Sequence, residues 1–110
     1  MKKSGSVSVA ANGTSGNVLA GSVIEFPERP SRIKAFATAA AVGVVGDLKA
    51  GARTVMEESV ISQANRFPLD PDDLMVQDAA LAGQRLSLTF RNTTGAAIIV
   101  YWSMSSDPVA

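Results

Sequence analysis

The amino-acid sequence predicts an all-β fold: an antiparallel β-sandwich, jelly-roll-like in its strand rhythm, with an extended N-terminal arm. Three observations support this prediction. Short runs of residues alternate between apolar and polar, which is the two-residue period of a half-buried strand. Clusters of Gly, Pro, Asn and Asp separate these runs, as they do in sandwiches and barrels. At 110 residues the chain has the length of a single domain.

The composition excludes several kinds of functional site. The chain contains no cysteine and no histidine, so it has no disulfide, no thiolate ligand and no Ser-His-Asp or Cys-His relay. Gly43 and Gly46 lack the Lys-Ser/Thr ending of a phosphate-binding loop. Glu57 and Glu58 are adjacent, so on a strand they would point to opposite faces and could not act as a pair. We therefore expect no enzymatic activity, no cofactor and no small-molecule substrate.

Residues 1–22 are predicted to form an N-terminal arm or an edge hairpin, followed by a sandwich body over 23–106 and a tail over 107–110. The first segment consists almost entirely of small residues, as flexible termini do. Val7 and Val9 nevertheless alternate with serines as in a strand, and Asn12-Gly13 is a hairpin-turn dipeptide. Because an alanine-rich chain of this length buries little apolar area, we expect the arm to add a strand to a neighbouring subunit.

The body is predicted to begin with strands over 18–26 and 32–42. Pro27 and Pro30 separate them, since proline has no N–H to donate to a sheet. For the next segment a strand over 53–61 and a helix over 50–64 both fit the sequence, and we leave the two alternatives open.

A turn-rich connection over 62–73 ends in the acidic residues Asp70, Asp72 and Asp73. Such a cluster is suited to cap a helix, so a short helix near residues 73–81 is expected within the all-β fold. Carboxylates can also bind calcium, but the glycine and the closing glutamate of an EF-hand loop are missing here. We expect no metal site, although the spacing alone leaves cation binding by the three aspartates open.

The clearest prediction is a hairpin made of residues 85–91 and 96–104, with a turn over 92–95. Residues 85–91 alternate strictly, and pairing Phe90 with Ile98 would place six large apolar side chains on one face. These six form the candidate core: Leu86, Leu88, Phe90, Ile98, Val100 and Trp102.

The opposite face of this hairpin carries Ile99 and Tyr101. A strand that is apolar on both faces lies either inside a covered sheet or at an interface, where tyrosine is enriched. Both interpretations stay open. The candidate assembly contacts are thus Val7 and Val9 in the arm, together with Ile99 and Tyr101.

Membranes and nucleic acids are not expected as partners. The longest nearly apolar stretch, over 35–45, is shorter than the roughly 20 residues that a membrane-spanning helix needs, and no secretion signal follows Lys2 and Lys3. The formal net charge of zero removes the general attraction to polyanions. We expect a protein made in a cytoplasm.

The strand rhythm over 24–104, the small-residue arm and the segment 78–86 resemble the small β-sandwich or jelly-roll structural proteins of virions, particularly those of bacteriophages. The chain is shorter than capsid-shell jelly rolls, so the resemblance implies a minor capsid, decoration or spike-base subunit in the virion. It implies a non-enzymatic subunit that self-assembles, as a homo-oligomer or with other structural proteins of the same particle.

The alternative is a carbohydrate- or receptor-binding β-sandwich module. Such modules expose aromatic side chains, and only Phe36, Phe67 and Tyr101 are available for that role here. An exposed Phe67 beside Tyr101 in a concave loop region would favour this alternative.

Overall fold

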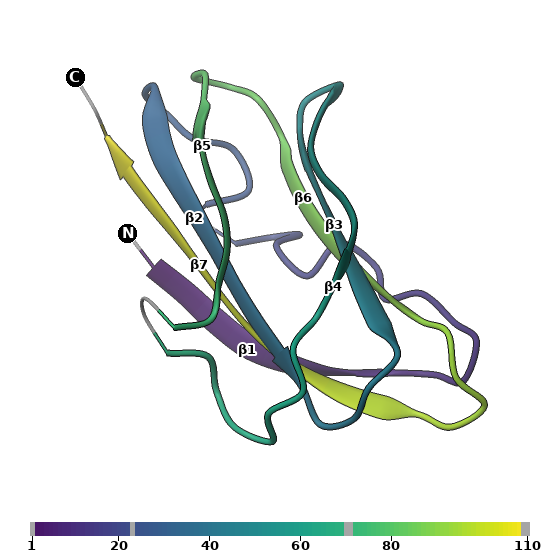
Figure 1. Cartoon of the computed structure of the whole chain (residues 1–110). Helices are drawn as coiled ribbons and strands as arrows, with labels where there is room; N and C mark the ends of the chain where they lie inside the picture. Colours follow the sequence, from purple (N-terminus) through teal and green to yellow (C-terminus); the bar gives the residue numbers. More distant parts are fainter. Residues whose placement is uncertain (1, 23, 70–71, 109–110) are drawn as a thin grey trace.

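The computed structural model describes residues 2–22, 24–69 and 72–108, and among them it shows seven strands and no helix. The strands pair antiparallel in two sheets, ordered β1-β7-β2-β5 and β4-β3-β6, which face each other (Figure 1). This confirms the predicted all-β antiparallel sandwich. The strand bounds are β1 (Lys2–Val9), β2 (Ser31–Ala39), β3 (Val44–Ala50), β4 (Arg53–Val60), β5 (Leu74–Ala80), β6 (Leu86–Asn92) and β7 (Ile98–Pro108).

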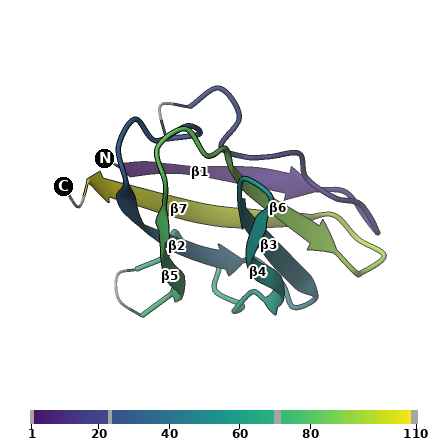
Figure 2. The same ribbon diagram turned by 90° about the horizontal axis from the view of Figure 1, so that it is seen from above.

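The segment over residues 12–18 borders the three-stranded sheet as an irregular additional strand. The Ser15 and Val18 amides donate to the carbonyl oxygens of Phe90 and Leu88 at 2.8 and 2.9 Å, along the outer edge of β6. With this segment each layer has four members, and the chain passes from layer to layer in a jelly-roll-like order. Figure 2 shows β1 and β5 at opposite sides of the four-stranded sheet.

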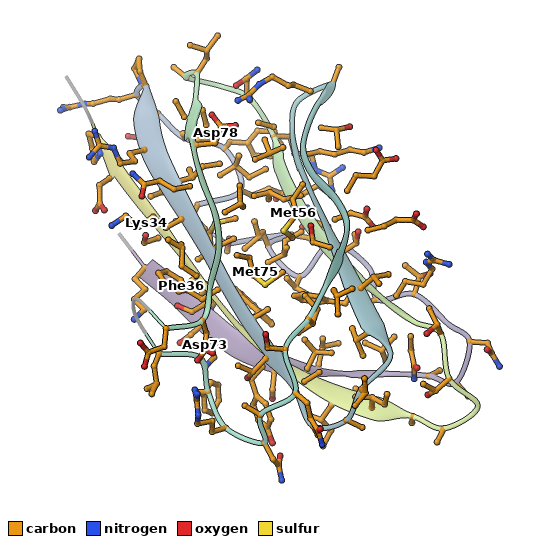
Figure 3. All side chains as sticks on the ribbon, in the orientation of Figure 1. Lys34, Phe36, Met56, Asp73, Met75 and Asp78 are labelled. Atoms are coloured by element: carbon orange, nitrogen blue, oxygen red, sulfur yellow. The ribbon has the colours of Figure 1, made fainter. Side chains whose placement is uncertain are left out.

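The core lies between the two sheets. All six predicted core side chains are buried there, with exposed fractions between 0% and 5%. Met56 of β4 and Met75 of β5 add their side chains from the side where those strands approach each other (Figure 3). The alternation of the sequence thus predicted correctly which side chains face inward.

The predicted hairpin of β6 and β7 is wrong. β6 pairs with β3, whereas β7 lies between β1 and β2, so the two strands face each other across the core from opposite sheets. Both arrangements bury the same six side chains, because alternation specifies the buried face of a strand and not its neighbour.

Asn92 holds the connection between β6 and β7 as an arch from one sheet to the other. Its side chain is buried, and Nδ2 donates to the carbonyl oxygens of Val9 at 3.1 Å and Ala96 at 2.6 Å. Its Oδ1 accepts from the Thr94 amide at 2.9 Å. One amide therefore satisfies backbone groups at the end of β1 and in the arch.

Residues 2–9 are not an arm that reaches a neighbour. β1 pairs with β7 of its own chain over its whole length, from Lys2 opposite Ser105 to Val9 opposite Ile98. The side chains of Val7 and Val9 face the core, since Val9 is buried and Val7 packs against it. Asn12 turns the chain with a φ of 54°, but the chain then crosses to β6 instead of returning along β1 as a hairpin.

The strand predicted over 18–26 is absent, and the side chain of Asn17 explains why. Its Oδ1 accepts from the Leu88 amide at 3.0 Å, and its Nδ2 donates to the Leu86 carbonyl at 3.1 Å. Because a side chain satisfies these groups of β6, the backbone turns away from the sheet. Leu19 and Ile24 then fill the core as buried side chains of a loop.

Three further elements differ from the prediction or decide between its alternatives. The short helix expected near residues 73–81 is wrong, because this segment is β5 and pairs with β2. The segment over 50–64 contains strand β4, paired with β3, and no helix.

The sequence interpretation missed β3. Gly43 turns the chain before it with a φ of 113°, and Gly46 lies inside it, where an added Cβ would be 3.1 Å from Ile61 Cδ1.

Replacing Asn92 with alanine is expected to lower the free energy of unfolding by about 2–3 kcal/mol, because buried backbone donors and acceptors lose their partners. Urea denaturation measures this change as a lower midpoint at an unchanged m-value. Gln63→Ala removes an exposed amide and is the control, expected to stay within about 0.5 kcal/mol of the parent. An Asn92→Ala variant as stable as that control would contradict the role given to this side chain.

Candidate functional site

The outer face of the four-stranded sheet points away from the core. β1 contributes three exposed serines, Ser4, Ser6 and Ser8, and β7 contributes Ile99 and Tyr101. On β2 the outward side chains alternate with the buried alanines of the core. Among them Phe36 and Thr38 are almost completely buried, at 4% and 0% exposure, so another segment covers this part of the face.

That covering segment is the connection over 61–69. The Ala39 amide donates to the Ser62 carbonyl at 3.0 Å, and the Ala64 amide donates to the Ala39 carbonyl at 2.9 Å, so the segment first runs beside β2. The Thr38 hydroxyl then donates to the Arg66 carbonyl, which holds the segment over the outer face.

Asp73 fixes the far end of this connection (Figure 3). One of its carboxylate oxygens accepts from Arg66 Nη1 at 2.5 Å and from the Leu69 amide at 2.7 Å. The hydrogen bond from Arg66 is the largest cause that holds the pKa of Asp73 below its ordinary value, against a smaller opposing effect of burial. The charged carboxylate therefore stabilises the folded loop.

The connection places an aromatic side chain beside β7. The rings of Phe67 and Tyr101 meet edge to face with their centroids 5.0 Å apart, and the Tyr101 hydroxyl donates to Asn65 Oδ1 at 3.1 Å. Phe67 is 53% exposed and Ile99 is 45% exposed. We call Asn65, Phe67, Ile99 and Tyr101 the aromatic ledge. In the ledge the predicted assembly contacts Ile99 and Tyr101 lie together with Phe67, the aromatic residue considered for carbohydrate or receptor binding.

Three of the four sheet edges are protected against pairing. Residues 12–18 occupy the edge of β6. β4 carries exposed Glu57 and Glu58, the latter with a φ of 45°, and its register with β3 shifts twice. At the edge of β5, Asp78 Oδ1 accepts from the Ala79 amide at 2.7 Å and Arg53 donates to the Ala79 carbonyl at 2.6 Å. Covering segments, bulges and edge charges of this kind prevent further strands from adding.

Apart from Lys2 and Lys3 at its start, the edge of β1 lacks these devices. Its register with β7 is regular over eight residues, it contains no proline, and residues 4–9 carry no charge. The Ala40 amide donates to the Ile99 carbonyl at 2.9 Å, so the backbone groups of Ile99 and every second residue of β7 point to β2, and the others point to β1. Ser4, Ser6 and Ser8 therefore direct their N–H and C=O groups to the outer edge. In the described part of the chain no strand pairs with them there.

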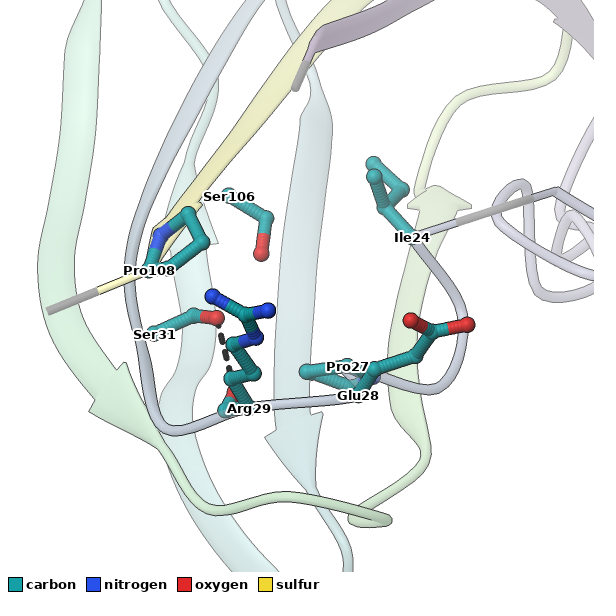
Figure 4. A pocket seen from close by; sticks show the side chains of 7 residues that line it. All are labelled: Ile24, Pro27, Glu28, Arg29, Ser31, Ser106 and Pro108. Carbon is teal, nitrogen blue, oxygen red and sulfur yellow. Dashed lines mark hydrogen bonds between the residues drawn. The ribbon is translucent and has the colours of Figure 1, made fainter. Parts of the chain in front are cut away.

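A pocket of about 380 Å³ lies between the loop over 24–31 and the end of β7 (Figure 4). Ile24, Pro27 and Pro108 form apolar walls, and the Arg29 side chain extends across the opening. The Ser31 hydroxyl donates to the Arg29 carbonyl at 2.8 Å. The Glu28 carboxylate points away from Ser31 in Figure 4, so it is not placed to activate that hydroxyl as a nucleophile.

Metal binding has no geometric support in residues 2–22, 24–69 and 72–108, which contain no group of three or more acidic side chains able to share an ion. Asp70 of the predicted acidic cluster lies outside these residues, and Asp73 is paired with Arg66. Over the same ranges no helix has the length and hydropathy to cross a membrane.

Acid is expected to destabilise the loop that carries the aromatic ledge. Because the pKa of Asp73 is lowered in the folded state, its stabilising effect is complete above the ordinary aspartate range and is lost as the pH falls through the folded value. The pKa values of Glu25 and Asp78 are lowered as well, chiefly by the hydrogen bond from Arg85 to Glu25 and by the hydrogen bond from the Ala79 amide to Asp78. The free energy of unfolding, measured in urea at pH values from 7 to 3, should therefore decrease once the pH is lower than about 4.

Asp73→Asn should be less stable than the parent at pH 7 and should lose less stability towards pH 3. Asp72→Asn, which removes an exposed carboxylate from the same loop, is the control and should keep the full decline. Equal pH dependence in the parent and in Asp73→Asn would show that Asp73 does not stabilise the loop through its charge.

Comparisons with protein-family models, with curated proteins and with solved structures give no match for this chain. The two features that the geometry singles out are the unprotected β1 edge and the aromatic ledge. Both lie on the four-stranded sheet, one at its side and the other on its outer face.

Proposed function

We propose that this chain is a non-enzymatic structural subunit that self-assembles into a larger symmetric particle, of the virion-associated type that its sequence resembles. The unprotected edge of β1 carries the proposal. An edge strand that is regular and, over residues 4–9, uncharged offers a row of unpaired backbone groups to another strand, and protein monomers normally prevent this. Here the other three edges are protected and this one is not.

Exposed apolar side chains give the proposal a second support. Phe67, Leu69, Leu74 and Ile99 are between 39% and 53% exposed, and Phe67 and Ile99 both belong to the aromatic ledge. Neighbouring exposed apolar groups are typical of interaction surfaces. A particle larger than a dimer needs at least two different contacts on each subunit, and the β1 edge and the ledge are two separate candidates.

A recognition module that binds carbohydrate or a receptor is the second candidate function. The observation that favours it is Phe67, which is half exposed and lies beside Tyr101. Aromatic faces next to an amide such as Asn65 suit the apolar face and hydroxyls of a sugar ring. Jelly-roll sandwiches include both capsid and lectin domains, so the fold by analogy does not choose between the two.

Ser6→Pro tests assembly through the β1 edge. Proline removes the outward N–H of residue 6 but keeps the hydrogen bonds between β1 and β7, which neighbouring residues make. We expect the parent to sediment as a particle larger than the monomer, and the variant to associate at least about tenfold more weakly, since a lost hydrogen bond and a steric block each cost about 1 kcal/mol or more.

Ser6→Ala is the matched control, because it removes the hydroxyl and keeps the N–H. It should assemble like the parent. A parent protein that stays monomeric at high concentration would refute the proposed function. A Ser6→Pro variant that remains folded by circular dichroism and assembles fully would show that another surface is responsible.

The second candidate is tested with neutral oligosaccharides in titration calorimetry. If the ledge binds sugars, the parent should show saturable binding that Phe67→Ala weakens at least about tenfold, since a stacked aromatic ring contributes on the order of 1.5 kcal/mol. Phe67→Tyr keeps the ring and should retain binding. A parent that binds no member of the panel would remove carbohydrate binding as a candidate.

A further inference from the structure

We propose that the strand that pairs with the β1 edge is β1 of a second copy, antiparallel to the first across a two-fold axis at Ser6. The two four-stranded sheets would then form one continuous sheet of four plus four strands. This inference rests on the proposed function and specifies its partner and register. It follows from the edges that a second copy offers, from the charges of β1 and from the side chains beside Gly5.

A second copy offers only one edge that matches. Its β6 edge is covered by residues 12–18, its β4 edge is bulged and acidic, and its β5 edge has the Ala79 backbone groups bound to Asp78 and Arg53. Pairing of β1 with the β6 or the β5 edge would break existing hydrogen bonds, and the bulged β4 edge offers no regular row of backbone groups. Pairing of β1 with β1 breaks none, and such a same-to-same contact closes as a two-fold dimer.

The charges of β1 favour the antiparallel direction. Lys2 and Lys3 stand at one end of the strand, and the residues from Ser4 to Val9 are uncharged. A parallel pair would bring the lysines of both copies together. In an antiparallel pair centred on Ser6 the two Lys2 residues are eight positions apart, or about 27 Å at 3.4 Å per residue, well beyond the screening length of about 8 Å.

The register follows from which backbone groups point outward. Ser4, Ser6 and Ser8 direct theirs to the edge, so they must face one another to exchange hydrogen bonds. Centring the pair on Ser6 sets Ser4 opposite Ser8 of the second copy and Ser6 opposite itself. Every outward residue from 4 to 8 is then paired, and all three serine side chains stay on the outer face.

The side chains of the inner face select this register over the neighbouring one. With the axis at Ser6, Val7 of the second copy lies opposite Gly5. Gly5 has no side chain, and the Trp102 indole approaches its backbone so closely that an added Cβ would be 3.2 Å from Cζ2. Val7 is only half-buried in the single chain and would gain apolar contact there. With the axis at Gly5, Val7 would instead face the charged Lys3.

Single cysteine variants test this geometry, since the natural chain has no cysteine and any disulfide must form at the introduced position. In the proposed pair the two Ser6 Cα atoms lie about 5.5 Å apart, within the range that a disulfide spans. The two Ser8 Cα atoms are four positions apart, or about 14 Å, which no disulfide spans. Under mild oxidation Ser6→Cys should convert almost completely to a covalent dimer, and Ser8→Cys should give at least tenfold less.

The outcomes separate the register from the function. If the parent assembles but Ser8→Cys crosslinks and Ser6→Cys does not, the proposed pairing is wrong, although assembly stands. If neither variant crosslinks while the parent assembles, β1 of a second copy is not the partner. If the parent is monomeric, both proposals fail. Circular dichroism of the reduced variants checks that both are folded, which we expect because Ser6 and Ser8 are both exposed edge positions.

Discussion

The arrangement of this sandwich depends on the buried amide of Asn92. Its side chain forms hydrogen bonds with the Val9 carbonyl at the end of β1 and with backbone groups of Thr94 and Ala96 in the arch. These bonds hold the chain where it leaves β6 and crosses to the opposite sheet. β7 can therefore insert between β1 and β2 instead of folding back on β6. The position of β1 at the rim of the four-stranded sheet follows from this crossing, and so does its unpaired side. One buried side chain thus stabilises the crossing that leaves this edge of β1 towards the solvent.

The sequence contained enough information to identify the fold class and the core. Alternation revealed the inward side chains of β6 and β7 because a buried face requires apolar residues at every second position. It could not reveal which strands are neighbours, since Phe90 and Ile98 are equally well buried in a hairpin and in an arch. The irregular segment beside β6 was also unpredictable, because the Asn17 and Ser15 side chains replace part of the backbone hydrogen bonding that a regular strand would make.

The sequence indicated which residues of the candidate site were available, but not that they lie together. Ile99 and Tyr101 were recognised as outward apolar residues, and Phe67 as an available aromatic ring. Their union depends on the Thr38 hydroxyl and on the Asp73 carboxylate, which hold a long connection across the sheet, and no local pattern signals such contacts. The edge position of β1 was only one of two alternatives for residues 1–22, for a related reason. Whether a strand is outermost is a property of the whole sheet order, to which residues distant in the chain contribute.

The close approach of Trp102 to Gly5 also makes the chain its own optical probe. Trp102 is the only tryptophan, it is 4% exposed, and its indole lies against the backbone of β1. Any event that lifts the first strand off its neighbour would admit water to the indole and shift its fluorescence emission to longer wavelength. Global unfolding and peeling of the N-terminal strand would both redden the signal, but only the second would leave the far-ultraviolet spectrum of the remaining sheets nearly intact.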